Sequence, residues 1–318
     1  MSDIRSANGL TQLLVGESCE MTRLRSYLDK VAASDASVLI TGETGTGKEC
    51  VARYLHQHSR RAHKPLTCIN CSALPDGLLE SELFGHERGA FTGAHQASLG
   101  RLRQASGGTL FLDEIGDMSS YAQAKILRAL EDREVTPVGG RCSERFDVRV
   151  IAATNVELET LVGSNRLRPD LYYRLNVVPL HLPPLRDRKE DIIHLFDHFM
   201  RTRLPAGTPL PTLSSEAIVL MLRYHWPGNV REVRNIVDRL LIDLPDAEIP
   251  AGSLPREMAL ASATAQSSEK ERLLTALMTT HWNKSKAAQA LHWSRMTLYR
   301  KLAKYNISAR PRAGSTRH

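Results

Sequence analysis

The fold of this chain is decided by one short stretch, Gly42-Glu43-Thr44-Gly45-Thr46-Gly47-Lys48-Glu49. It follows a short apolar run, Val38-Leu39-Ile40-Thr41, that reads as a buried strand, and it opens a helical segment toward His58. Glycines at such a turn let backbone N–H groups point inward around phosphate, and the start of the helix adds partial positive charge. A strand, this turn and a helix in that order predict a phosphate-binding loop whose Lys48 reaches the β- and γ-phosphates of a nucleotide.

The loop departs from most phosphate-binding loops at one position. Glu49 stands where most of them carry a Ser or Thr that binds Mg²⁺, so the residues alone leave the first protein ligand of the metal open. An ordinary glycine-rich turn is the alternative, but the strand before it and the helix after it favour nucleotide binding. The loop residues expected to bind ATP are Gly42, Glu43, Thr44, Gly45, Thr46, Gly47, Lys48 and Glu49.

A second apolar strand, Thr109-Leu110-Phe111-Leu112, ends in the carboxylates Asp113 and Glu114. With a phosphate-binding loop upstream, Asp113 is expected to hold Mg²⁺ and Glu114 to polarise the water that attacks the γ-phosphate. Two acids at the exit of a strand are common, which is the alternative. A third strand is expected over 149–153, and residues 122–131 have helical spacing. Strands that alternate with helices predict an α/β fold with a parallel sheet covered on both faces.

Between these two motifs lies a segment that would make a poor core. Gly89-Ala90-Phe91-Thr92-Gly93-Ala94 places one aromatic and one hydroxyl residue between glycines. This composition favours a mobile loop that presents Phe91 and Thr92 to a partner, with an ordinary turn as the alternative.

The net charge of +7 is concentrated at one end of the sequence. Residues 269–318 hold 11 Lys/Arg and 2 Asp/Glu, a net charge of +9, whereas residues 1–268 hold 31 and 33, a net charge of −2. A strongly basic module on a nearly neutral body predicts a polyanion partner for that module alone.

The basic module reads as three short helices over 269–281, 284–291 and 295–305. Asn283 can cap the second helix and Ser294 the third. This is the helix-turn-helix arrangement, in which the last helix enters the major groove of double-stranded DNA. A solvated cationic face on a small bundle is the alternative. The residues expected to contact DNA are Lys284, Lys286, Arg295, Thr297, Tyr299, Arg300, Lys301 and Lys304.

Composition excludes several other classes of protein. No apolar run approaches the ~18 residues needed to cross a bilayer, and the N-terminus leads into no apolar signal segment. Five cysteines are few and odd in number, which favours a reducing compartment and hence the cytoplasm. Cys68 and Cys71 form a CxxC, but no second pair lies nearby to complete a zinc site. We read them as half-buried thiols at the end of a strand.

Taken together, these motifs resemble the bacterial enhancer-binding proteins, the AAA+ activators of σ54 RNA polymerase. The hexapeptide 89–94 matches that family's signature, the phosphate-binding loop matches too, and members generally carry an acid where Glu49 stands. The basic module resembles the family's Fis-type helix-turn-helix, except that His292-Trp293 replaces the usual Gly and small aliphatic residue. Because His tolerates the left-handed conformation better than most residues, we expect the motif to survive. The resemblance covers about Leu14 to Ile307.

The resemblance implies a hexameric ring with ATP and Mg²⁺ between subunits, and a loop 89–94 that reaches σ54. It also implies roles for five further residues. Asn70 would restrain Glu114 until the γ-phosphate is sensed, and Asn155 would be the sensor I residue. The remaining three are arginines: Arg168 and Arg174, offered to the neighbouring subunit's nucleotide, and Arg231, at the sensor II position.

The expected organisation has six parts: an N-terminal tail over 1–13, an α/β ATPase subdomain over 14–183, a helical lid over 184–244, a linker over 245–268, a helix-turn-helix domain over 269–307 and a basic tail over 308–318. About thirteen residues precede the ATPase part, as in family members that lack an N-terminal regulator, such as the phage-shock activator. We therefore expect control by a partner protein or by expression level.

The expected function is that of a cytoplasmic ATPase that binds upstream DNA and remodels the closed complex of σ54 RNA polymerase holoenzyme with its promoter. Two alternatives stay open: a DNA-binding regulator whose ATPase fold serves only ligand sensing or oligomerisation, and an AAA+ remodeller of another protein. Phe91-Thr92 together with Asp113-Glu114 favours the first reading, because a pure repressor has no need to keep both pairs.

Overall fold

A computed structural model describes residues 14–205, 207–245, 247–264, 269–305 and 307 of the chain. The two expected tails, 1–13 and 308–318, lie outside these residues. Internal contacts divide the described chain into two units, one formed by Leu14 with Leu24–Pro183 and the other by Val15–Arg23 with the residues from Pro184 onward. None of the helices in the described part of the chain combines the length and the apolar character that a membrane crossing requires.

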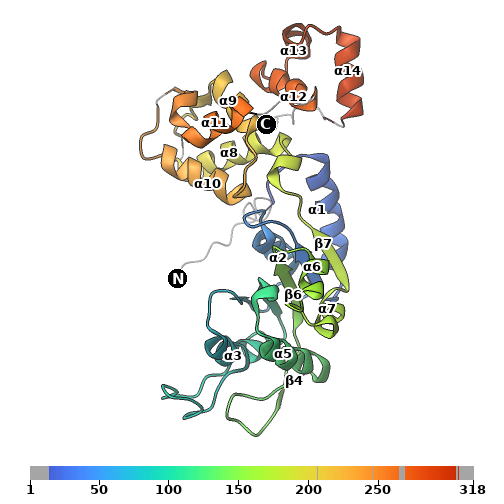
Figure 1. Cartoon of the computed structure of the whole chain (residues 1–318), viewed down its shortest axis with the longest axis vertical. Coiled ribbons are helices and arrows are strands. Elements are labelled where there is room, and N and C mark those ends of the chain that lie inside the picture. The colour runs from blue at the N-terminus through green and yellow to red at the C-terminus, as the bar shows by residue number, and fades with distance from the viewer. Residues whose placement is uncertain (1–13, 206, 246, 265–268, 306, 308–318) are drawn as a thin grey trace, which may run out of the picture. The chain divides into compact units, whose positions relative to one another are not determined.

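The first unit is built on a five-stranded parallel sheet (Figure 1). The strands lie side by side in the order β2 (Leu66–Asn70), β3 (Thr109–Asp113), β6 (Arg149–Thr154), β1 (Val38–Thr41) and β7 (Val178–His181). All pairs are parallel, with Thr41 opposite Thr154 and Leu112 opposite Ala152. The carboxyl ends of β1, β6 and β3 therefore meet at one edge of the sheet.

Successive residues of a strand point to opposite faces of the sheet. Because the residues of the central strands are apolar in succession, both faces must be buried, and helices cover them. Leu39, Leu110 and Ala152 join a core formed with α3 (Asp76–Phe84), α5 (Ser120–Asp132) and α7 (Pro169–Leu175). The alternate residues, such as Ile40 and Phe111, are buried as well. The expected α/β fold is thus confirmed. The remaining elements of this unit are α2 (Lys48–Gln57), α4 (Arg101–Gln104), η2 (Ile115–Asp117), β4 (Glu134–Val135), β5 (Glu144–Arg145) and α6 (Leu158–Gly163). Helix α1 (Cys19–Ala32) is divided between the units, its residues from Leu24 onward belonging to this one.

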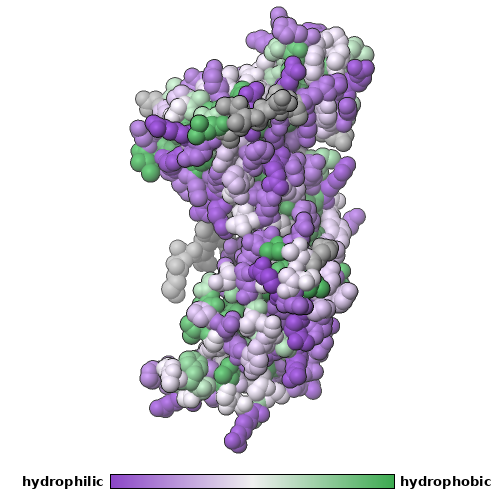
Figure 2. Space-filling view, in the orientation of Figure 1, coloured by the Kyte–Doolittle hydropathy of each residue, from purple (hydrophilic) through white to green (hydrophobic). Residues whose placement is uncertain are grey.

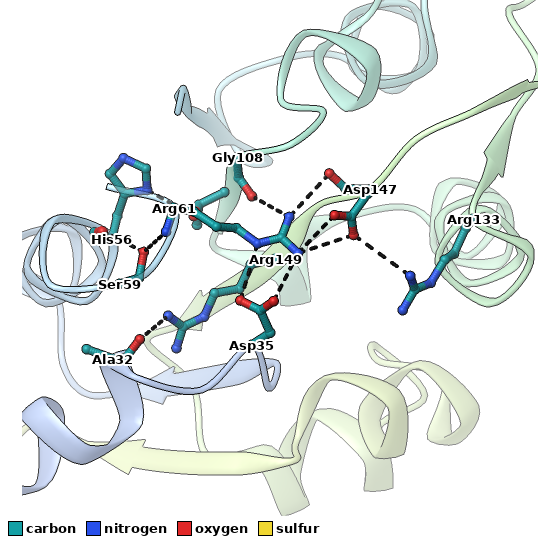
Figure 3. A network of polar contacts seen from close by, with 10 residues as sticks. Ala32, Asp35, His56, Ser59, Arg61, Gly108, Arg133, Asp147 and Arg149 are labelled. Atoms are coloured by element: carbon teal, nitrogen blue, oxygen red, sulfur yellow. Dashed lines mark hydrogen bonds and ion pairs between the residues drawn. The ribbon is translucent and has the colours of Figure 1, made fainter. Parts of the chain in front are cut away.

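A polar network holds the opposite edge, where the strands begin (Figure 3). Arg61 Nη2 lies 3.1 Å from Asp35 Oδ2 and 3.0 Å from Asp147 Oδ2. The hydrogen bond from Arg61 holds the pKa of Asp35 below its usual range. Beside it, buried Arg149 donates from Nη1 to the carbonyl oxygen of Ala32, at 3.1 Å, where α1 ends. A cation at this position complements the negative end of the helix dipole.

The lid portion of the second unit is helical, as expected. It consists of η3 (Leu185–Asp187), α8 (Glu190–Arg203), α9 (Ser215–Arg223) and α10 (Asn229–Leu240). Ser214 caps α9, its Oγ accepting from the backbone N of Ala217 at 3.2 Å. The core surrounds Trp226, which is fully buried and donates from Nε1 to the carbonyl oxygen of Met221 at 2.8 Å.

The expectation of an irregular linker over 245–268 is wrong for most of its length. Within it lie β9 (Glu248–Ile249), which pairs with β8 (Thr212–Leu213), then η4 (Ala251–Ser253) and α11 (Arg256–Thr264). Ile249, Leu254 and Met258 are buried in the lid core. Three apolar side chains at irregular spacing are enough to fix a segment on an existing core, although they leave no period in the sequence. Residues 246 and 265–268 lie outside the described part.

The last three helices form the expected small bundle: α12 (Glu269–Thr279), α13 (Lys284–Ala290) and α14 (Arg295–Lys304). Asn283 caps α13 and Ser294 caps α14, each accepting from backbone N–H groups of the first turn. At the unusual turn His292 takes the left-handed conformation, with φ 53°. The backbone N of Trp293 donates to the carbonyl oxygen of Ala288 at 2.9 Å, and the Trp293 ring packs on the bundle core.

Candidate functional site

Lys48 begins α2 with its ammonium group turned back into the glycine-rich loop. Its Nζ donates to the carbonyl oxygen of Gly42 at 2.9 Å and lies 3.5 Å from Glu114 Oε1. Only 7% of the lysine side chain is exposed. Gly45 and Gly47 have φ of 79° and 107°, the left-handed region that favours glycine. The loop thus concentrates one buried cation where the helix begins, as phosphate binding requires.

Strand β6 runs between β1 and β3, so its end lies between the loop and the two carboxylates. The backbone N of Asn155 donates to Glu114 Oε2 at 3.0 Å, and its side-chain Nδ2 donates to Thr44 Oγ1 at 3.2 Å. Glu114 itself has φ 54° and ψ 53°, a conformation rare outside glycine. The sheet therefore gathers Lys48, Glu114 and Asn155 from three different strand ends into one cluster.

Asp113 ends β3 beside Glu114. Burial first, and the neighbouring Glu114 carboxylate second, raise the pKa of Asp113 above its usual range. Two adjacent carboxylates are oxygen donors of the kind that hard divalent cations prefer. Within the described residues no group of three or more His, Cys, Asp or Glu side chains forms a metal site. Asp113 and Glu114 can offer one or two carboxylates to a cation whose other ligands come from phosphate and water, an arrangement that fits Mg²⁺.

Two expected site residues have other partners. Asn70 Oδ1 accepts from Ser72 N at 2.9 Å and Ser72 Oγ at 2.8 Å, and no hydrogen bond in the described part of the chain joins it to Glu114. Glu49 forms an exposed i,i+4 pair on α2, with its Oε1 2.6 Å from Arg53 Nη2. The role that the family resemblance implies for Asn70, and the expected part of Glu49 in ATP binding, stay predictions.

The hexapeptide 89–94 closes on itself at the tip of a long excursion between α3 and α4 (Figure 1). The backbone N of Gly89 donates to the carbonyl oxygen of Ala94 at 2.9 Å, and Ala94 N donates to that of Phe91 at 3.0 Å. Phe91 is 39% exposed and Thr92 is exposed. The face seen in Figure 2 is mostly polar, with apolar side chains scattered over it. An exposed aromatic ring on a closed glycine-flanked loop is well placed to contact a partner.

The connection between β4 and β5 packs against this loop, which sequence reasoning missed. The backbone N of Glu87 donates to the carbonyl oxygen of Val138 at 3.0 Å, and Val138 N donates to that of Gly85 at 2.8 Å. A Cβ on Gly139 would lie 2.9 Å from the Cβ of Ala90, so only glycine fits without displacing the loop. The glycine pair at 139–140 was the one feature of the sequence that could have indicated a close approach of this connection to another backbone segment.

The third helix of the basic module presents most of its expected DNA contacts. Arg295, Tyr299, Arg300 and Lys304 are exposed, as is Lys286 on α13, while Lys284 and Thr297 are partly buried. Lys301 differs, because its Nζ lies 2.7 Å from Glu269 Oε1 of α12 and its side chain is only 19% exposed. The helical period alone cannot reveal that pair, which depends on how α12 and α14 pack.

Comparisons with known proteins agree with this geometry. Three family descriptions match successive parts of the chain: the Sigma-54 interaction domain over 14–181, the AAA+ ATPase lid domain over 186–273, and the bacterial regulatory protein, Fis family, over 265–305. The transcriptional regulatory protein ZraR of Salmonella typhi is 45% identical over 313 residues, which cover 95% of this chain and 71% of ZraR. This chain belongs to the σ54-dependent transcriptional activators.

Other activators and solved structures support the same assignment. The DNA-binding transcriptional regulator NtrC of Rhizobium meliloti is 42% identical over 338 residues, covering 93% of this chain and 70% of NtrC. The crystal structure of NtrX from Brucella abortus in complex with ATP is 34% identical with a TM-score of 0.75, covering 94% of this chain and 72% of NtrX. This σ54 activator is accordingly an AAA+ ATPase with a Fis-type helix-turn-helix.

Arg168 and Arg174 of this σ54 activator have partners outside the cluster around Lys48. Arg168 pairs with Asp170 at 2.7 Å, and Arg174 donates from Nη2 to the carbonyl oxygen of Leu130 at 2.8 Å. Both side chains are exposed, and within the described residues neither is bonded to the nucleotide cluster of its own chain. Arg231, exposed on α10, belongs to the second unit.

Proposed function

We propose that the chain binds an upstream DNA site, assembles into a hexameric ring, and uses ATP hydrolysis to remodel the closed complex of σ54 RNA polymerase with its promoter. The observation that carries this proposal is the cluster in which Glu114 joins Lys48 and Asn155, together with the exposed Phe91-Thr92 loop. A remodelling ATPase needs both a hydrolytic centre and a surface that touches its target.

In the hydrolytic step, Lys48 exchanges its contact with Glu114 for the phosphates of ATP. Glu114 is then free to accept a proton from the attacking water, and Asn155 orients the water or the γ-phosphate. Asp113 would hold Mg²⁺, which neutralises charge on the phosphates. Asn70 restrains Glu114 before the γ-phosphate is sensed.

Arg168 and Arg174 are offered to the nucleotide of a neighbouring subunit, where a guanidinium stabilises charge on the γ-phosphate. Their exposure, and their bonds to Asp170 and Leu130, which lie outside the cluster of their own chain, support this assignment. Arg231 acts as sensor II on the lid. Because these arginines would act on the ATP bound to a neighbouring subunit, ATP hydrolysis depends on assembly of the subunits.

The six residues of loop 89–94 are proposed to touch σ54, and the exposed residues of α13 and α14 to touch DNA. The cysteines are five in number, few and odd, which fits a reducing compartment, and we place the activator in the cytoplasm.

The test is ATP-dependent open-complex formation with σ54 polymerase on duplex and pre-melted promoter DNA. Glu114→Gln should bind ATP but fail to hydrolyse it or open the duplex, while Glu131→Gln, an exposed acid on α5, should behave as the wild type. Duplex opening by Glu114→Gln at the wild-type rate would refute the proposed function.

A further inference from the structure

His86 fastens the base of the loop that carries Phe91, and it does so with both its backbone and its ring. Its backbone N donates to the carbonyl oxygen of Ser98 at 3.1 Å, and Ser98 N donates back to that of His86 at 2.9 Å. The two arms of the loop therefore pair at this residue. On its other side, Gly85 and Glu87 bond to Val138 of the β4–β5 connection.

Both ring nitrogens of His86 are engaged. Nε2 lies 2.9 Å from the carbonyl oxygen of Gln96, which can only accept, so Nε2 carries a proton and donates it. Nδ1 lies 2.6 Å from Ser81 Oγ, and in the neutral ring it accepts from that hydroxyl. Ser81 is buried in α3, whereas Gln96 belongs to the returning arm. The imidazole is thus fixed between the body of the unit and the loop.

The fixed ring supports Phe91. The centroids of the two rings are 5.0 Å apart with an interplanar angle of 62°, an edge-to-face arrangement. Such geometry is favoured because the positive edge of one ring meets the negative face of the other. Phe91 keeps 39% of its surface exposed, so one side rests on His86 while the rest stays open to a partner.

We infer that His86 is a positioning residue that sets the direction in which Phe91 meets σ54. This inference rests on the proposed contact between loop 89–94 and σ54. His86 has no bond to the nucleotide cluster in the described part of the chain, so it acts on engagement of the target and not on ATP chemistry. The His86 ring packs against Phe91, and the hydrogen bonds at its two nitrogens fix the orientation of that ring.

The test is a double-mutant cycle on binding of the full chain to σ54 in the presence of a non-hydrolysable ATP analogue. His86→Gln keeps a donor near Gln96 but removes the ring, and Phe91→Leu removes the aromatic partner. Each single change should weaken σ54 binding about five- to tenfold, because loss of an aromatic pair and of its orientation is of that order. In the Phe91→Leu background, His86→Gln should have no further effect, since both changes remove the same interaction.

A residue with a merely structural role would give additive losses, and additivity would overturn the inference. His95→Gln, the same change at an exposed histidine of the same loop, should leave binding within about twofold. If His86→Gln fails to fold, as judged by its melting curve, His86→Phe replaces it. That variant keeps the ring without the two hydrogen bonds, and it must also weaken binding for the inference to stand.

Failure of the inference can be told apart from failure of the proposed function. If Phe91→Leu itself leaves σ54 binding unchanged, the loop does not contact σ54 and the proposed function fails. If Phe91→Leu weakens binding but His86→Gln does not, only the role of His86 is refuted. ATP turnover of His86→Gln should match the wild type, and a parallel loss of turnover would also refute a role confined to Phe91.

Discussion

Lys301 and Arg300 are neighbours on α14, but their removal should affect DNA binding very differently. The Lys301 ammonium lies 2.7 Å from one oxygen of Glu269 and 2.8 Å from the other, and the hydroxyl of Tyr305 donates to the same carboxylate. Its charge is therefore already compensated within the protein. Arg300 is exposed, and its guanidinium has no hydrogen bond or ion pair with the described residues. Arg300 can displace counterions from DNA, whereas Lys301 would first have to break its ion pair with Glu269 in order to bind a phosphate.

The expected magnitudes follow from this contrast. Removing one phosphate contact lowers the slope of log affinity against log salt by about 0.9. Removing one base contact costs about 1–3 kcal/mol, or roughly 5- to 150-fold in affinity. Arg300→Ala should show one of these two effects. Lys301→Ala should keep the salt slope and an affinity within about twofold of the wild type.

Lys301→Ala should instead lower the melting temperature in a pH-dependent manner. Hydrogen bonds from Lys301 and then Tyr305 hold the pKa of Glu269 below its usual range. A carboxyl with a lowered folded pKa stabilises the fold above its unfolded pKa and loses that contribution as the pH falls through the folded pKa. The difference between variant and wild type should thus be present at neutral pH and vanish in acid.

Fluorescence anisotropy of the full chain with labelled duplex DNA, over a series of salt concentrations, measures both slopes. A non-specific duplex reports phosphate contacts, and a site selected from random duplexes reports base contacts. An equal decrease in slope for Lys301→Ala and Arg300→Ala would refute the reasoning, because it would mean that Glu269 does not hold Lys301 in solution.

Four further outcomes are expected. Lys48→Ala should lower ATP turnover by a factor on the order of 10²–10³ or more, because it removes a donor to the phosphates. DNA affinity should stay unchanged, and an equal loss of ATP turnover and DNA affinity would mean that the ATPase and DNA-binding modules are not separable. Thr92→Ala should keep ATP turnover and lose transcription from a σ54 promoter. Activation that persists in a transcription assay would show that Thr92 makes no essential contact to σ54 within loop 89–94, the contact loop. Asp35→Asn should lower the urea midpoint at neutral pH but not in acid, since the lowered pKa of Asp35 stabilises the fold only above its unfolded pKa. His292→Gly should leave the melting temperature unchanged or raise it. Glycine relieves about 1–2 kcal/mol of strain from the left-handed conformation and costs about 0.5–1 kcal/mol through the greater backbone entropy of the unfolded chain. A clear drop in melting temperature would show that the His292 side chain itself stabilises the turn.

Much of the nucleotide cluster could be predicted from the sequence because its residues stand at the ends of short apolar strands. β1 has the expected bounds, and β3 and β6 extend the expected strands by one residue each. Parallel strands bring their carboxyl ends to one edge, so Lys48 and Glu114 had to come close once the strands were recognised. The caps at Ser214, Asn283 and Ser294 were predictable for a similar reason, because capping is a local property of one side chain.

Features that depend on packing between distant segments were not predictable in this way. Met258 and Ile249 look like members of a linker until the lid core is present to bury them. The pair between Lys301 and Glu269 depends on the packing of two helices, and the bonds of Val138 to the contact loop join segments about fifty residues apart. Asn70 was placed by resemblance, and here its amide oxygen is bonded to Ser72.

The fastening of the contact loop has a consequence for the entropy of association. A free loop would lose about 1–2 kcal/mol of backbone entropy for each residue ordered on a partner. Here Gly89 is bonded to Ala94, and Ala90 is packed on Gly139, before any partner arrives. A preorganised tip gives up less freedom on binding, so even a small contact around Phe91 can contribute substantial affinity. Under the proposed contact with σ54, each round of binding would therefore carry a smaller entropic cost.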